Sequence, residues 1–426
     1  MKSNLVKRGF LSLLVTQFFG AANDNVLKQV LSYGVAMAGI WAAALGRGGQ
    51  AYVALCLTVP FILLSGYGGQ LADRHSKQRI TVIVKIAEVF IACFVLAGFV
   101  LMNIWMLLVG MVLLAVQSTF FGPAKYGMIP ELVEGQELSR ANGLINMLTN
   151  IAVITGTLIA GPLYKAYHPE SDPDFVPGTG AVLWLPGAAM IVIAIGGLIA
   201  STFLTRLEAK DPHLKFDWNP VGTYWAALKE MSRSPLLIVA VAWSYFYLIA
   251  MIAMLILPDY KTMLNIDTTE TSYLFVVLAV SIGLGSVLAG FISGRHIEPR
   301  LIPIGAVGMT VFFVLLGLLP LHYFLVAGLL LGAGVFAGFY IVPLQALLQY
   351  LSPVDERGRF LGTANAVSFV CLSIGSLIFL FARAVLDLSP NRIFLICAGL
   401  AFIGIGFMIW RLRGLMTDPN IRRPAR

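Results

Sequence analysis

The chain has 426 residues, of which 58% are hydrophobic and 12% charged, with a mean hydropathy of +0.86 and a formal net charge of +8. A soluble domain carries roughly 25% charged residues, so this composition excludes an ordinary soluble protein. The Lys and Arg residues are dispersed over short polar segments and form no single patch, which argues against nucleic-acid binding and indicates membrane orientation instead.

The apolar residues are gathered into runs that are long enough to cross a bilayer. A crossing helix needs about 20 apolar residues, because lipid offers no hydrogen-bond partner to the backbone. The runs lack the alternation of a barrel strand, so we predict an all-α membrane protein of about twelve transmembrane helices. The predicted spans cover residues 9–40, 50–72, 79–102, 104–128, 141–167, 181–204, 236–258, 270–294, 300–320, 322–350, 359–386 and 391–412.

The first span follows a basic arm and resembles a signal peptide, but it continues past Asp24 and Lys28 and is too long for a signal core. Gln17, Asp24 and Lys28 lie on one helical face, with Asn25 beside them. A charge near the bilayer midplane costs on the order of 3 kcal/mol unless it is paired or hydrated. Two interpretations stay open: Asp24 and Lys28 neutralise each other, or they face a hydrated cavity and contact a polar substrate group, a proton or Na⁺.

The loop after the second span, residues 69–79, combines glycine with one acidic and several basic side chains. Such a loop can bind anionic headgroups or place its carboxylate at the N-terminal end of a neighbouring helix, or it can simply set the topology. We predict that this loop, together with the loops before the fifth and eleventh spans, takes part in conformational change. The residues are Gly69, Asp73, Arg74, Arg79, Arg140, Glu356 and Arg357.

Polar side chains continue through the third, fourth and fifth spans, whereas the second half of the chain has fewer of them. The polar stripe of the fifth span could also serve only to pack helices together. We predict a substrate site formed by Gln17, Asp24, Asn25, Lys28, Glu88, Gln117, Lys125, Asn146 and Gln345. An amphipathic substrate would fit this asymmetry, with its headgroup in the first bundle and its chain against the second bundle or lipid.

An internal repeat divides the chain into two halves. Residues 68–79 and 289–300 share the pattern G-x-[LI]-x-x-R-H-x-x-x-R, although Gly294 occupies the acidic position in the second copy. We predict two six-helix bundles, residues 1–204 and 236–412, joined by a cytoplasmic loop, 205–235, and followed by a basic tail, 413–426. Most Lys and Arg residues fall in the arm, the even-to-odd loops and the tail, so the positive-inside rule places both termini in the cytoplasm.

Several short motifs, taken together, indicate a protein family more specifically than any one of them does. They are QFFGAANDN at 17–25, PF at 60–61, GQLAD at 69–73, FGPAKYG at 121–127, PEL at 130–132, ANG at 141–143 and VPLQALLQ at 342–349. The set resembles the bacterial lysophospholipid transporter family of the major facilitator superfamily, and the transporter portion of acylglycerophosphoethanolamine acyltransferase fusion proteins. The resemblance implies alternating access and inward flipping of lysophospholipids, chiefly lysophosphatidylethanolamine, across the bacterial inner membrane for reacylation.

The acyltransferase of those fusion proteins uses a His-x-x-x-x-Asp motif, which this sequence lacks, because His168 and His213 have an aspartate at i+4 instead. We therefore expect a transporter that is not an enzyme, needs no cofactor or metal, and relies on a separate acyltransferase. Family resemblance implies a monomer. Two alternatives stay open: a proton-coupled exporter of drugs or another small solute, in which Asp24 or Glu88 titrates, and a membrane scaffold or receptor that transports nothing.

Overall fold

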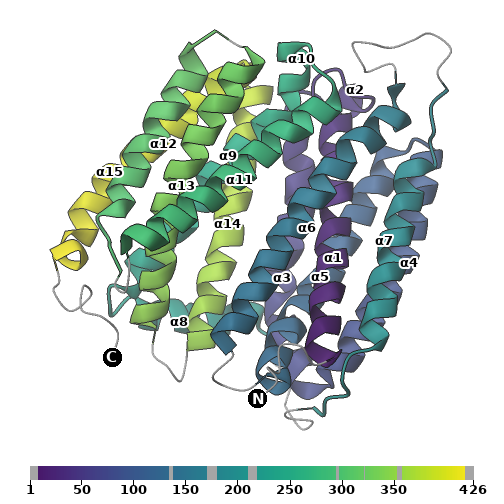
Figure 1. Ribbon diagram of the computed structural model, residues 1–426, viewed down its shortest axis with the longest axis horizontal. Helices are drawn as coiled ribbons and strands as arrows, with labels where there is room; N and C mark the ends of the chain where they lie inside the picture. The colour runs from purple at the N-terminus through teal and green to yellow at the C-terminus, as the bar shows by residue number, and fades with distance from the viewer. Residues whose placement is uncertain are drawn as a thin grey trace. The chain divides into compact units, whose positions relative to one another are not determined.

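The computed structural model describes residues 8–133, 138–169, 180–209, 218–293, 297–320, 322–352 and 357–417 (Figure 1). The regular structure of these residues is helical, without a strand. The chain divides into two compact units: unit 1 is Met1–Pro220 with Asp267–Ser272, and unit 2 is Val221–Ile266 with Tyr273–Arg426. The boundary at Pro220 falls within the polar connection between the predicted bundles.

Unit 1 is a helical bundle in which α1 packs against α6 and α7, α3 packs against α5, and α4 packs against α5 and α7. Its helices are α1 (Arg8–Val35), α2 (Ala42–Leu45), α3 (Gln50–Arg74), α4 (Lys77–Val100), α5 (Ile104–Leu132), α6 (Leu138–Tyr167) and α7 (Leu185–Thr202). The central position of α1 brings its polar side chains against several neighbours.

Unit 2 repeats this organisation, with α9 packed on α14 and α12 packed on α13 and α15. Its elements are α8 (Pro220–Met231), α9 (Leu236–Ile256), the 3₁₀ turn η4 (Leu257–Asp259), α10 (Tyr260–Leu264), α11 (Thr268–Ser293), α12 (Leu301–Leu318), α13 (Tyr323–Leu351), α14 (Arg357–Ala384) and α15 (Pro390–Thr417). Pro220 and the first residues of α11 are grouped with unit 1.

Ten helical segments of the described chain are long and apolar enough to cross a membrane. Two further long helices complete the set: α1 has 28 residues but carries Asp24 and Lys28, and α15 contains the shorter apolar segment Pro390–Gly404. Together they agree with the predicted architecture of about twelve spans, and the chain is a multi-pass membrane protein.

The first helix ends at Val35, earlier than predicted. The backbone N–H of Trp41 donates to the Gly34 carbonyl at 2.7 Å, so the chain folds back on the end of α1. A Cβ atom on Gly34 would lie only 2.4 Å from the Trp41 ring. The glycine therefore allows the indole to cover the helix end. The apolar run from which the span was predicted continues through this turn to Ile40, so it extends beyond the helix.

Candidate functional site

The polar residues of α1 connect this helix to three others in unit 1. The contacts are Gln17 to Thr149 of α6 at 2.9 Å, Asn23 to Glu88 of α4 at 2.9 Å, and Ser118 of α5 to Asp24 at 2.7 Å. Helical spacing places these side chains along α1, the packing of α5 and α6 against it supplies the partners of Asp24 and Gln17, and Glu88 of α4 reaches Asn23 through a side-chain hydrogen bond.

One group of charges is fully enclosed, and we refer to Asn23, Lys85 and Glu88 as the closed triad. Lys85 Nζ lies 2.5 Å from Glu88 Oε2, and Asn23 Nδ2 donates to Glu88 Oε1; all three residues are 0% exposed. A Cβ atom on Gly20 would lie 2.4 Å from Lys85 Nζ, so the glycine makes room for the ammonium group. Each carboxylate oxygen of Glu88 accepts a hydrogen bond from a protein group, so Glu88 is held within unit 1 by Lys85 and Asn23.

A second group has unsatisfied polar atoms. Asp24 Oδ2 accepts a hydrogen bond from Ser118 Oγ, which in turn accepts one from Gln117 Nε2 at 3.1 Å. Within the described chain, Asp24 Oδ1 and Gln117 Oε1 are buried without a hydrogen-bond partner. Leaving a buried polar atom unsatisfied costs about 1–3 kcal/mol, so such atoms require an explanation, and a bound ligand is one.

Two lysines accompany these atoms without an acidic partner. Lys28 is half-buried and Lys125 is buried. In the part of the chain that the structure describes, no carboxylate oxygen lies within 4 Å of either ammonium group. Both interact electrostatically with Asp24, and Lys125 Nζ also lies 4.5 Å from the ring centroid of Tyr126.

We call Asp24, Lys28, Gln117, Ser118 and Lys125 the open cluster. Its two lysines and single aspartate leave one formal positive charge, whereas the Lys85–Glu88 pair is neutral. The open cluster thus offers cations for an anionic group and carbonyl or carboxylate oxygens for a hydrogen-bond donor. It is suited to a ligand that carries both kinds of group.

The other predicted contacts are placed differently. Gln17 is occupied by Thr149, and Asn25 Nδ2 donates to the Ala21 carbonyl of its own helix at 2.8 Å. Asn146 is exposed on α6, and Gln345 is exposed on α13 of unit 2. The structure therefore links Gln117 to Asp24 through Ser118 and places Lys28 and Lys125 within electrostatic range of Asp24, and it gives Gln17 and Asn25 local structural partners.

The loop after α3 is held by a residue that the sequence analysis did not single out. Lys77, which is 3% exposed, binds Glu131 of α5 at 2.5 Å between Nζ and Oε1. Asp73 and Gly69 are half-buried, Arg74 and Arg79 are exposed, and a Cβ atom on Gly69 would have no atom outside its own helix within 4 Å. Glu356 lies outside the described residues, as do the side chains of Arg140 and Arg357.

Unit 2 has a largely apolar interior. Its buried pair of charges, Arg383 Nη2 and Asp259 Oδ2 at 3.3 Å, lies near the ends of α14 and η4. Arg383 is 4% exposed and donates to the Leu388 carbonyl, so it is buried, in contrast to the usual behaviour of an arginine near a helix end, which extends to the membrane surface. Within the described residues, no group of three or more His, Cys, Asp or Glu could hold a metal.

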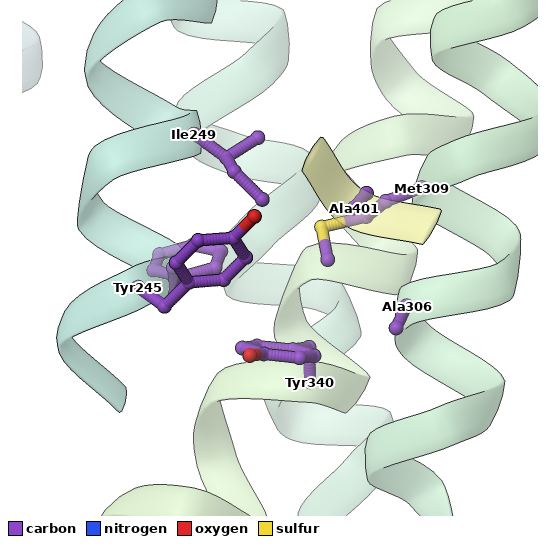
Figure 2. Close-up of a pocket in the computed structure, with 7 residues that line it drawn as sticks. Tyr245, Ile249, Ala306, Met309, Tyr340 and Ala401 are labelled. Carbon is purple, nitrogen blue, oxygen red and sulfur yellow. The ribbon is translucent and has the colours of Figure 1, made fainter. Parts of the chain in front are cut away.

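A small cavity in unit 2 is surrounded by Tyr245, Ile249, Met309 and Tyr340 (Figure 2). Its volume of about 10 Å³ is close to that of one water molecule. Tyr245 donates to the Leu400 carbonyl at 2.7 Å and Tyr340 to the Ala242 carbonyl at 3.0 Å. These aromatic residues pack the helices together, and the cavity is too small for a substrate.

Ser118 and Asn23 contact predicted site residues but are absent from the substrate site predicted from the sequence. Ser118 follows Gln117 directly, and Asn23 precedes Asp24, so their position next to a predicted residue is the feature of the sequence that could have identified them. Their partners lie 94 and 65 positions away in the sequence, which spacing within one helix does not reveal.

Comparison with known proteins places the chain among membrane transporters. The sequence model of the Major Facilitator Superfamily matches residues 9–376 and 246–424. The Lysophospholipid transporter LplT of Klebsiella pneumoniae is 27% identical over 382 residues, which cover 86% of this chain and 85% of the relative. The protein of the same name from Yersinia pestis is 26% identical over 378 residues, 85% of this chain and 82% of the relative.

Solved structures resemble the chain over nearly its whole length. A bacterial homologue of the human lysosomal transporter Spinster has a TM-score of 0.72 at 14% identity, covering 98% of each chain. The nucleoside transporter NupG has a TM-score of 0.70 at 12% identity, covering 96% of this chain and 100% of its own. At such low sequence identity these structures show the fold alone, and this fold agrees with the predicted one.

Proposed function

Since the chain belongs to the Major Facilitator Superfamily, we propose that it is a secondary transporter that flips lysophospholipids, such as lysophosphatidylethanolamine, across the bacterial inner membrane for reacylation. The names of the LplT relatives support this substrate class, and the open cluster supports it independently. Family and relatives are transporters, in agreement with the prediction that the chain is not an enzyme.

The observation that carries the proposal is that unit 1 holds one group of buried charges that are paired and another group whose charges are not. The closed triad satisfies its own charges, whereas the open cluster keeps one carboxylate oxygen of Asp24 without a partner and two lysines without a carboxylate. Buried charges in a membrane helix are expensive and mark a functional site by default. The open cluster is therefore where a polar headgroup binds.

The headgroup of lysophosphatidylethanolamine combines an anionic phosphate with an ammonium group. The phosphate binds Lys125, because an ammonium group binds phosphate as a point charge, and Lys28 adds a second positive charge within electrostatic range of Asp24. The ethanolamine ammonium donates to Asp24 Oδ1 and Gln117 Oε1, the two buried oxygens of the open cluster that lack a hydrogen-bond partner. The closed triad holds α1 against α4 and positions the cluster, and rocking of the two halves of the fold exposes it to alternate sides.

The distribution of basic residues supports cytoplasmic termini. The inward direction of this proposal, from the outer leaflet to the cytoplasmic side, comes from the family resemblance. The product is then available to a separate acyltransferase. The protein acts as a monomer in this proposal, with its site contained in one chain.

Flux in proteoliposomes tests the proposal. The purified protein is reconstituted with fluorescent lysophosphatidylethanolamine in one leaflet, and the inward movement is followed by dithionite quenching. We expect transport by the wild-type protein, and a loss of at least about tenfold, equivalent to about 1.4 kcal/mol, in Asp24→Asn and Lys125→Gln. A pH jump in the same assay reports whether a proton gradient drives transport.

Lys229→Gln is the matched control, because Lys229 is an exposed lysine on α8 and its loss changes the net charge equally. This variant should transport at the wild-type rate. Wild-type flux no faster than that of protein-free liposomes would refute the function, and normal flux in both Asp24→Asn and Lys125→Gln would refute the site.

A further inference from the structure

Unit 1 contains an apolar groove of about 740 Å³ that the polar site does not use. Its walls come from α3 and α5, with α2 at one end, and none of the lining side chains carries a charge. The residues that define it are Leu55, Val59 and Pro60 on α3 and Trp105, Val109 and Leu113 on α5. A volume of this size is in the range of about 300–1,000 Å³ that is typical of small-molecule sites.

The groove follows from the way in which α3 and α5 pack. Leu55 and Val59 are four residues apart on α3, as are Trp105, Val109 and Leu113 on α5, so each helix presents one continuous apolar face. The two helices approach closely elsewhere, at Gly68, where a Cβ atom would lie 2.8 Å from the Thr119 carbonyl oxygen. The groove lies at the other end of this helix pair, beside Pro60.

The groove ends one helical turn from the open cluster along α5, and its lining includes none of the open-cluster residues. Leu113, at one end of the groove, is four residues from Gln117, and four residues of helix span about 6 Å. Gln117 binds Ser118, which binds Asp24. The apolar groove and the charged open cluster thus lie one after the other along α5. A lipid with a single acyl chain has the same arrangement, with the apolar chain next to the charged headgroup.

We propose that this groove binds the acyl chain of the lysophospholipid while the headgroup occupies the open cluster, an inference that rests on the proposed function. Unit 1 then contacts both parts of the substrate, which departs from the sequence-based expectation that the chain lies against the second bundle or lipid. The groove selects by shape, because an acyl chain gains little hydrophobic free energy on moving from lipid into an equally apolar surface. A bulky side chain in the groove should therefore block transport.

Photo-crosslinking tests the placement directly on the wild-type protein. The probe is lysophosphatidylethanolamine with a diazirine near the end of its acyl chain, and the adducts are mapped by mass spectrometry. We expect adducts on α3 between residues 52 and 60 and on α5 between 105 and 113, reduced at least tenfold by excess unlabelled lysophosphatidylethanolamine. Diacyl phosphatidylethanolamine with the same diazirine reports general lipid contact, and equal labelling of these segments by both probes would overturn the proposal.

Groove filling gives the second measurement. Val109→Trp should reduce flux at least tenfold, whereas Val192→Trp, a matched substitution at an exposed position of α7, should leave flux unchanged. If wild-type protein transports the lipid but Val109→Trp does so equally well and the adducts map to other helices, the acyl-chain site is wrong and the transport function stands. If the wild-type protein transports no lysophospholipid, both proposals fail.

Discussion

In unit 1 the buried charges Lys85, Glu88 and Lys125 lie within long helices and Lys77 lies at the start of α4, whereas in the described part of unit 2 the buried charges Asp259, Lys261 and Arg383 lie at helix ends or in the short α10. A charge at a helix end can relax towards the membrane surface, but one in the middle of a span has no such route. The comparison teaches that pairing alone does not identify a site. Both units contain a buried ion pair, and unit 1 also keeps charged groups that no protein group neutralises.

The closed triad should give the largest loss of stability. Glu88→Met strands the Lys85 ammonium in a fully buried position, and breaking such a pair costs about 3–5 kcal/mol. Titration with sodium dodecyl sulfate in mixed micelles measures the free energy of unfolding. The double variant Lys85→Met/Glu88→Met should recover most of the loss, and a double variant as unstable as Glu88→Met would contradict this explanation.

The pair in unit 2 should cost less to break. Arg383→Met removes the partner of Asp259, and we expect a loss of about 3 kcal/mol, the lower end of the range for buried pairs, because the site lies near the ends of two elements. The same detergent titration measures it. At a temperature where the variant stays folded, its headgroup selectivity in the flux assay should equal that of wild type, and altered selectivity would show that unit 2 contacts the headgroup.

The smallest expected effect concerns the space beside Lys85. Gly20→Ala places a methyl group where Lys85 Nζ lies, and overpacking costs about 1–3 kcal/mol, opposed by a gain of up to about 1 kcal/mol in helix propensity. In the Lys85→Met/Glu88→Met background the same substitution should cost less. An equal cost in both backgrounds would show that Gly20 is required for a reason other than Lys85.

The sequence predicted the helices closely, because membrane spans depend on local runs of apolar residues. The ends of α3 and α4 fall within two residues of their predicted limits, and the resemblance to a transporter family is confirmed by the superfamily match. Other ends differ by up to five residues: α1 ends early at Val35 and α15 continues to Thr417. The early end of α1 depends on a turn at Gly34 and Trp41 that a hydropathy pattern does not reveal.

The site was less predictable, since it depends on distances between helices. Helical spacing identified Asp24 and Lys28, but it could not show that they lie without a mutual ion pair within 4 Å, or that Glu88 is taken by Lys85 and Asn23. The same limit applies to Arg383, whose partner Asp259 lies 124 positions earlier in the sequence. Their roles in transport stay predictions until flux is measured.

The loop after α3 combines buried residues that attach it to the bundle with exposed basic side chains. Lys77 is buried and pairs with Glu131 of α5, and the Ser76 hydroxyl donates to the Leu207 carbonyl at 2.6 Å, so the start of α4 is held to α5 and to the segment after α7. Arg74 and Arg79 project outward from this fixed support. Substituting them should change the electrostatic potential at the surface that faces phospholipid headgroups, while the melting temperature stays constant. Membrane affinity could therefore be altered at this short segment without a change in folding stability.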